Sequence, residues 1–164
     1  PAGQGTYDIF YPRQLGANDT KHPVITWGNG NGSTPAVYEG LLRHLASWGF
    51  VVVASTSGAV GNGQAILAGA QYMVAKNGDP TSRFHDKLDV HRVGAAGHSR
   101  GGAGALNAML KSNGLLKSGL TVSTPQPGLR WPTESYQPSQ LTRPALFLGA
   151  EDDKIAPPRA LASH

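Results

Sequence analysis

The chain has 164 residues, a formal net charge of +4, no cysteine, and many glycines (22) and prolines (12). This length suits one domain, here residues 1–164, and the absence of cysteine excludes disulfides, thiolate metal sites and a cysteine nucleophile. The basic residues are scattered without interleaved aromatic residues, so we expect no nucleic-acid groove, and no apolar run approaches the about 18 residues of a membrane span.

Short strands and one helix are predicted in the first part of the chain. Strand patterns cover residues 6–11, where apolar side chains alternate, and the buried-type runs 23–27 and 50–54. Between the last two runs, Thr34 is typical of a helix N-cap and is followed by proline. Apolar residues then recur at helical spacing until Gly49 ends the helix.

The second part of the chain repeats the alternation of helices and strands. A helical stripe covers residues 64–76, a strand covers 92–96, a second helix runs to Gly114, and strands follow at 120–123 and 145–149. Buried strands that alternate with helices predict the α/β class, a mostly parallel sheet with helices on both faces. In such a sheet the reactive groups are expected at the carboxyl ends of the strands.

The run Gly-His-Ser-Arg-Gly at residues 97–101 lies where the strand 92–96 gives way to a helix. That context is typical of a nucleophile elbow, in which a sharp turn between glycines exposes one serine, here Ser99, above the sheet. The helix that follows points its backbone N–H groups toward developing negative charge. Because glycine and serine also occur in ordinary turns, a plain strand-to-helix turn is the alternative.

Two further loops follow predicted strands. A serine nucleophile needs an imidazole to accept its proton and a carboxylate to orient that imidazole. Any acid of the loop 149–153 could be this carboxylate, or the loop is a solvated acidic turn. The loop 28–32 is placed to offer a backbone N–H that, with the N–H of Arg100, would form an oxyanion hole. A dinucleotide site is disfavoured, because Ser33 replaces the third glycine of that fingerprint.

Histidine is the third group that this chemistry needs. Five histidines precede the acidic loop: His22, His44, His85, His91 and His98. In the chain order serine, acid, histidine that accompanies such an elbow, only His164 follows the acid. His85 and His91 neighbour aspartates at a spacing that a metal site could use, but such spacing is common by chance, and we expect a structural turn there and no metal.

Four stretches of the chain match a known pattern: residues 9–12, 45–52, 92–102 and 143–157, of which the last is the most specific. They resemble the α/β-hydrolase superfamily and, more closely, the bacterial polyester hydrolases (cutinase-like and polyethylene terephthalate hydrolases) with their dienelactone-hydrolase and chlorophyllase-like relatives. The resemblance implies that Ser99 is the nucleophile. It also implies that Asp153, rather than Glu151 or Asp152, orients the imidazole.

The resemblance further implies Asn31 and Arg100 as the two oxyanion donors, and Trp131 as a wall against the substrate. The chain departs from the family at the first two positions, where an aromatic residue and a methionine are usual. The family's histidine lies further along than His164, beyond another helix and strand, and the family has extra strands before the counterpart of Thr6. We therefore expect a chain truncated at both ends, with the catalytic histidine beyond it.

The sequence thus predicts a serine carboxylic-ester hydrolase that cleaves polyesters or small acyl esters through an acyl-enzyme intermediate. From the resemblance we expect a secreted bacterial monomer without a cofactor, whose signal peptide is not present in this chain and whose partner is an ester or polyester substrate. Three alternatives stay open: a core that binds esters or polymer surfaces without turnover, a shortened triad completed by His164, and a non-hydrolytic interaction module.

Overall fold

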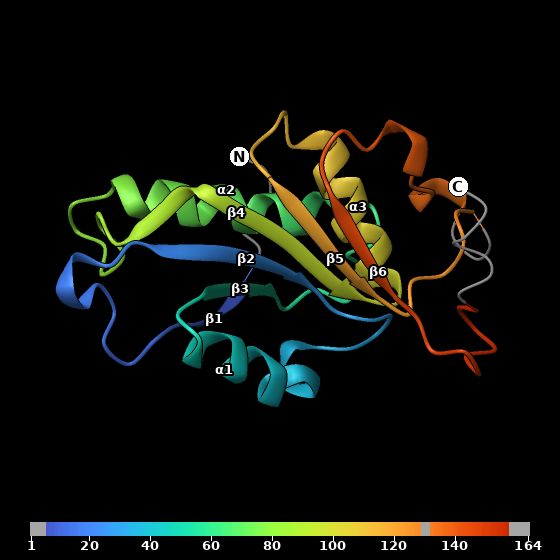
Figure 1. The fold of residues 1–164 in the computed structure, drawn as a ribbon, viewed down its shortest axis with the longest axis horizontal. Helices are drawn as coiled ribbons and strands as arrows, with labels where there is room; N and C mark the ends of the chain where they lie inside the picture. Colours follow the sequence, from blue (N-terminus) through green and yellow to red (C-terminus); the bar gives the residue numbers. More distant parts are fainter. Residues whose placement is uncertain (1–5, 129–131, 158–164) are drawn as a thin grey trace.

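The computed structural model describes residues 6–128 and 132–157, in which six strands form one sheet. The strands are β1 (Tyr7–Phe10), β2 (His22–Gly28), β3 (Val51–Ser55), β4 (Leu88–His98), β5 (Ser118–Val122) and β6 (Ala145–Leu148). Their order across the sheet is β1-β3-β2-β4-β5-β6 (Figure 1). β1 is antiparallel to β3 and the other neighbours are parallel, so the sheet is mostly parallel, as predicted.

Helices cover the two faces of the sheet unequally (Figure 1). α2 (Gln64–Gly78) and α3 (Arg100–Lys111) lie side by side on one face, and α1 (Glu39–Ser47) lies on the other. The connections contain short 3-10 turns: η1 (Ala17–Asp19), η2 (Pro35–Tyr38), η3 (Pro132–Glu134) and η4 (Pro138–Gln140). Beside α1, an apolar hollow of about 630 Å³ remains over β4 and β5, so this face is covered only in part.

The helix predicted after Thr34 begins later than expected. Pro35 opens the 3-10 turn η2 and Thr34 makes no side-chain cap. Tyr38, with φ −107° and ψ 8°, has a conformation that separates this turn from α1. The predicted stop is confirmed, because Gly49 has a positive φ of 97° and its N–H donates to the carbonyl of Ala46.

The larger part of the core lies between the sheet and the helices α2 and α3. It includes Val53, Ile66 and Leu106, which are almost fully buried. A smaller cluster under α1 is built around Trp27 and Leu42. Burial of each such side chain contributes roughly 1.5–3 kcal/mol. The turn between β4 and α3 is therefore attached to the larger of the two core clusters, to which both elements contribute.

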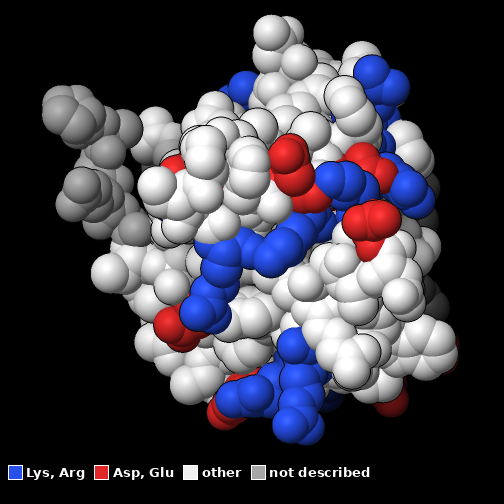
Figure 2. Space-filling view, turned by 90° about the vertical axis from the view of Figure 1, so that its left-hand side faces the viewer, with Lys and Arg blue, Asp and Glu red and all other residues white. Residues whose placement is uncertain are grey.

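Charged side chains gather at the end of the molecule where β2 and β4 begin. Figure 2 shows this end, where Lys and Arg side chains form a band with Asp and Glu side chains beside it. Arg92 pairs with Asp89, and Lys76 pairs with Asp79. The carboxyl ends of the parallel strands lie at the opposite end (Figure 1). Within residues 6–128 and 132–157, no helix combines the length and apolar character that crossing a bilayer requires.

Candidate active site

Ser99 lies at the turn between the end of β4 and the start of α3, so the strand and the helix expected on either side of it are confirmed. Its φ of 53° and ψ of −124° are rarely adopted by residues other than glycine. The Ser99 N–H donates to the carbonyl of Val122 at 2.8 Å, and the Ser99 carbonyl accepts the N–H of Gly102 at 2.9 Å. These bonds hold the strained turn between β5 and the first turn of α3.

The glycines around Ser99 are required by close contacts between backbones. A Cβ on Gly97 would lie 2.2 Å from the carbonyl oxygen of Gly101. A Cβ on Gly101 would lie 2.1 Å from the carbonyl oxygen of Gly28, at the end of β2. Real Cβ atoms do not approach backbone this closely, so the Gly-x-Ser-x-Gly pattern allows α3 to begin directly against the ends of β2 and β4.

Neighbouring strand ends connect the Ser99 turn to the acidic loop. β4, β5 and β6 are parallel neighbours. The N–H of Ser99 binds the last carbonyl of β5, and the N–H of Ser123 binds the carbonyl of Leu148, the last residue of β6, at 2.8 Å. The chain after β6 therefore starts at the same edge of the sheet as Ser99, which is the arrangement that parallel strands predict.

Asp153 lies in this acidic loop and accepts hydrogen bonds from the chain that follows it. Its Oδ1 accepts the N–H groups of Ile155 and Ala156, each at 2.9 Å. The backbone N–H of Ala156 and then that of Ile155 hold the pKa of Asp153 below its usual value of 3.8, with smaller contributions from the Ser123 hydroxyl and from the charge of His98. A carboxylate next to Ser123 and His98 thus stays ionised near the Ser99 turn.

The glycine-rich loop after β2 lies on the other side of the Ser99 turn, because Gly28 is paired with Gly97 across β2 and β4. Asn31 is exposed, and no acceptor for its backbone N–H occurs among residues 6–128 and 132–157. The preceding N–H, that of Gly30, donates to the hydroxyl of Tyr38 at 2.9 Å. Among the described residues, the loop therefore presents one backbone N–H without an acceptor, that of Asn31, next to the N–H of Gly30, which is already paired.

The side chain of Arg100 connects this loop to a distant part of the chain. Its Nε donates to Glu134 Oε2 at 2.7 Å, its Nη2 also donates to Glu134, and its Nη1 donates to Asn31 Oδ1 at 2.9 Å. The Arg100 and Glu134 side chains are only 16% and 13% exposed. The hydrogen bonds that Arg100 donates to Glu134 raise the pKa of Arg100 above its usual value. We call these contacts of the guanidinium group the Arg100 bridge.

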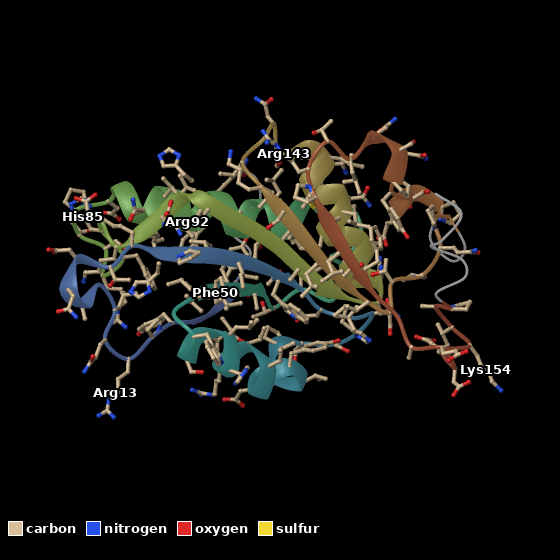
Figure 3. The ribbon with its side chains drawn as sticks, viewed as in Figure 1. Arg13, Phe50, His85, Arg92, Arg143 and Lys154 are labelled. Atoms are coloured by element: carbon tan, nitrogen blue, oxygen red, sulfur yellow. The ribbon has the colours of Figure 1, made fainter. Side chains whose placement is uncertain are left out.

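None of the described histidines is hydrogen-bonded to the Ser99 hydroxyl within residues 6–128 and 132–157. His22 starts β2 and is buried, with its two ring nitrogens bonded to backbone groups. His85 lies at the end of the molecule opposite to Lys154, the neighbour of Asp153 (Figure 3). His98 shares a hydrogen bond of 2.9 Å with the Tyr38 hydroxyl. The other histidines, His44 and His91, are exposed.

Two predicted site residues, His164 and Trp131, lie outside the described residues. The histidines and aspartates near His85 are the other feature of the sequence that bears on a metal site. His85 Nε2 lies 3.3 Å from Asp86 Oδ2, but the described residues contain no group of three or more histidine or acidic side chains that could hold a metal ion. The segment at His85 and Asp86 is a turn, which is the structural alternative to a metal site.

Sequence reasoning missed the polar partners of the loop after β2. Tyr38 belongs to an apolar stripe of the predicted helix, and that pattern gives no sign that its hydroxyl bonds to both Gly30 and His98. Glu134 lies in a proline-rich segment 34 residues after its partner Arg100. The only available signal was the presence of an arginine where the resembled family usually has methionine.

The mostly parallel sheet, with helices on both faces and a sharp strand–serine–helix turn, is an α/β-hydrolase-type fold. Comparison with protein families narrows this class. The model of the PETase family (PET hydrolase-like) matches residues 1–164, and the chain belongs to that family.

Curated relatives agree with this family. The chain is 28% identical over 167 residues to cutinase est1 of Thermobifida alba, covering 99% of this chain and 50% of the relative. It is also 28% identical over 167 residues to a bis(hydroxyethyl) terephthalate hydrolase of Streptomyces coelicolor, covering 99% and 48%. For cutinase 2 of Thermobifida cellulosilytica the identity is 28% over 160 residues, covering 94% and 55%. The chain thus spans about half the length of these relatives.

Proposed function

We propose that this protein is a serine carboxylic-ester hydrolase that cleaves polyesters or small acyl esters. The observation that carries the proposal is the strained conformation of Ser99 at a sheet edge where the loop of Asn31 and the loop of Asp153 also begin. The names of its relatives, cutinases and a terephthalate ester hydrolase, support the same class of reaction.

In the proposed reaction the Ser99 hydroxyl oxygen attacks the ester carbonyl carbon while a histidine outside the described residues accepts the hydroxyl proton. The carbonyl oxygen becomes an oxyanion that accepts hydrogen bonds from the backbone N–H groups of Asn31 and Arg100, each worth about 3–4 kcal/mol in such sites. The ester C–O bond then breaks, and the histidine returns the proton to the departing alcohol. Water attacks the acyl-enzyme by the same route and releases the acid.

Asp153 is proposed to orient that histidine and to stabilise its charged form. Because its pKa is held below 3.8, the carboxylate is ionised at neutral pH, as this role demands. His164 would complete a shortened triad, and a histidine further along in the full-length protein is the other source of the base. The role of Trp131 as a wall against the acyl group rests on the family resemblance.

The remaining proposals concern substrate and setting. Asn31, an exposed amide, stands where an aromatic side chain is usual in the resembled family, so we propose that the acyl group is not clamped by an aromatic ring in this loop. Residues 1–164 are proposed to be one partial catalytic domain of a secreted bacterial monomer that needs no cofactor.

A second candidate is a core that binds esters or polymer surfaces without turning them over. It is favoured by one observation, that no histidine of the described ranges is hydrogen-bonded to the Ser99 hydroxyl. A protein of this kind would adsorb to a polyester film and would not release p-nitrophenol from a soluble p-nitrophenyl ester.

The test of the first proposal compares the full-length protein with its Ser99→Ala variant in p-nitrophenyl ester turnover. The expected result is turnover by the natural protein and its loss, by roughly 10⁴-fold or more, in the variant. Near-normal turnover by Ser99→Ala would show that another group performs the reaction. Absence of turnover in both proteins would favour the binding core.

A further inference from the structure

Arg100 has two roles in the proposed site, one for its backbone and one for its side chain. Its backbone N–H, in the first turn of α3, is one proposed oxyanion donor, and its side chain donates at 2.9 Å to Asn31, the residue that carries the other proposed donor. One residue therefore connects both halves of the proposed oxyanion hole.

The orientation of the Arg100 guanidinium group is fixed by Glu134. Two of its nitrogens, Nε and Nη2, donate to the two carboxylate oxygens of Glu134, which leaves Nη1 directed at Asn31. Such two-point pairs between arginine and a carboxylate fix the plane of the group as well as its distance. Because both side chains are largely buried, water screens this ion pair less than it screens an exposed one.

Glu134 is itself held in place by the body of the molecule. Its backbone carbonyl accepts a hydrogen bond of 2.7 Å from the side-chain amide of Asn107, in α3. The same amide donates to the carbonyl of Gly61 at 2.8 Å. A Cβ on Gly61 would lie 1.9 Å from Glu134 Oε2, so glycine at this position leaves room for the carboxylate. The Arg100 bridge is thus anchored on α3 and not on a free surface segment.

The loop that receives the bridge has little other support on its outer side. Asn31 is exposed, and Gly32, with a φ of +68°, has open space where a Cβ would be. On its inner side the loop is held at Gly30, through the Tyr38 hydroxyl. Apart from the contact to Arg100, the segment around Asn31 is held by the bond of the Gly30 N–H to Tyr38 and by the turn bond from the Ser33 N–H to the Gly30 carbonyl at 3.0 Å, and neither of these bonds involves Asn31 itself.

We propose that Arg100 and Glu134 are positioning residues, which set the Asn31 N–H at the distance from the Arg100 N–H that an ester oxyanion requires. This inference rests on the proposed function. The Asn31 N–H interacts strongly with the ester oxygen only after negative charge has developed on it. Loss of the bridge therefore reduces stabilisation of the transition state and leaves substrate binding almost unchanged. The inference gives a function to the arginine that replaces the methionine usual in the resembled family.

The test uses the full-length protein and steady-state kinetics with a soluble p-nitrophenyl ester. Arg100→Met keeps the backbone N–H and removes the bridge, and we expect kcat to fall about 10–100-fold with KM within about 2-fold. Asn31→Ala keeps the backbone N–H of residue 31 and removes the side-chain oxygen that accepts the hydrogen bond of Arg100. It should therefore reduce kcat by a similar factor. A trifluoromethyl ketone, which forms an oxyanion adduct, should lose affinity by the same factor as kcat/KM.

Two comparisons separate positioning from a general structural effect. The double variant Arg100→Met/Asn31→Ala should be no slower than the slower single variant, because both remove the same contact. Arg43→Met is the matched control, since Arg43 forms an exposed ion pair with Glu39 in α1, with side chains 70% and 51% exposed, and it should retain normal kcat.

The outcomes distinguish this inference from the proposed function. If Ser99→Ala is inactive but Arg100→Met and Asn31→Ala turn over with normal kcat, the bridge has no positioning role and the proposed function stands. Strictly additive losses in the double variant would also overturn the inference. If Arg100→Met fails to fold by thermal melting, Asn31→Ala alone decides, because Asn31 is exposed. Full activity of Ser99→Ala removes the proposed function and the inference together.

Discussion

The Ser99 turn and the acidic loop lie at the same edge of the sheet but are held in different ways. Around Ser99, buried glycines bring backbone from β2, β4 and α3 into direct contact. In the acidic loop, the hydrogen bonds of Asp153 are mainly to nearby backbone groups, those of Ala150, Ile155 and Ala156, with a smaller contribution from the Ser123 hydroxyl. The loop follows a strand whose Leu148 is 45% exposed. The first region is fixed by packing between distant segments, and the second by a local turn.

Because of this difference, substitutions in the two regions should affect folding stability and ester turnover in different proportions. A change at the Ser99 turn should lower the free energy of unfolding as well as activity, because the backbone contacts there belong to the core. A change of the Asp153 side chain should lower activity alone, because the loop has few contacts to lose.

The largest expected effect is on activity in the acidic loop. In the full-length protein, Asp153→Asn should reduce kcat by about 10⁴-fold, because the amide does not hold the imidazole in the required tautomer. Its melting temperature should change by less than about 2 °C, because the amide oxygen of the new side chain can still accept the N–H groups of Ile155 and Ala156. Asp152→Asn is the matched control, an exposed neighbour that should leave kcat unchanged. A large loss of kcat in Asp152→Asn together with normal kcat in Asp153→Asn would show that Asp152, and not Asp153, orients the histidine.

The next effect is on stability at the Ser99 turn. Gly101→Ala places a Cβ 2.1 Å from the carbonyl oxygen of Gly28 and 2.3 Å from that of Asn29. Since backbone cannot yield as a flexible side chain can, we expect a loss of about 3 kcal/mol, which lowers the melting temperature by about 6–12 °C, or loss of folded protein. Gly40→Ala, in α1 with open space around its Cβ, should instead add about 0.5–1 kcal/mol. Equal melting temperatures for both variants would contradict the packing account.

A smaller effect is expected at Tyr38, whose hydroxyl connects the loop after β2 to His98 at the end of β4. Its hydroxyl accepts the Gly30 N–H and bonds to His98, so Tyr38→Phe leaves a half-buried backbone donor without its partner. We expect a stability loss of about 1–2 kcal/mol and a several-fold fall in kcat, measured by denaturant unfolding and ester turnover. Tyr72→Phe is the control, because the Tyr72 hydroxyl makes no hydrogen bond within the described ranges. Equal stability and equal kcat in the two variants would show that the Tyr38 hydroxyl does not support the loop after β2.

The smallest effect concerns pH. The pKa of Asp153 is lowered in the folded state, so its ionisation contributes stability that is present above the unfolded value of 3.8 and is lost as pH falls through the lower folded value. The melting temperature of the natural protein, compared with that of Asp153→Asn, should therefore keep a constant small advantage between pH 7 and 5 and lose it below pH 3.8. An advantage that grows as the pH falls would contradict the direction of this pKa shift.

The fold could be predicted because its signals are local. The alternation of buried strands and helical stripes predicts the α/β sheet, and the glycines around Ser99 mark the turn between β4 and α3. The delayed start of α1 was not predicted, because helical spacing of apolar residues does not distinguish the 3-10 turn η2 from the α-helix that follows it.

The candidate site was predictable only in part, for a similar reason. Ser99 follows from a short motif and Asp153 from a family resemblance. The Arg100 bridge joins residues 34 and 69 positions apart in the chain, and no periodicity or motif relates arginine to Glu134 or to Asn31 over such separations. Long-range polar pairs of this kind are visible only once the fold has brought the segments together.

The most direct test of the central claim is covalent labelling of the full-length protein by a fluorophosphonate, in which the Ser99 oxygen displaces fluoride from phosphorus. The account predicts one adduct on the peptide that contains Ser99, its absence in Ser99→Ala, and its marked slowing in Asp153→Asn. Ester turnover by a protein whose Ser99 stays unlabelled, or an adduct on a different serine, would contradict it.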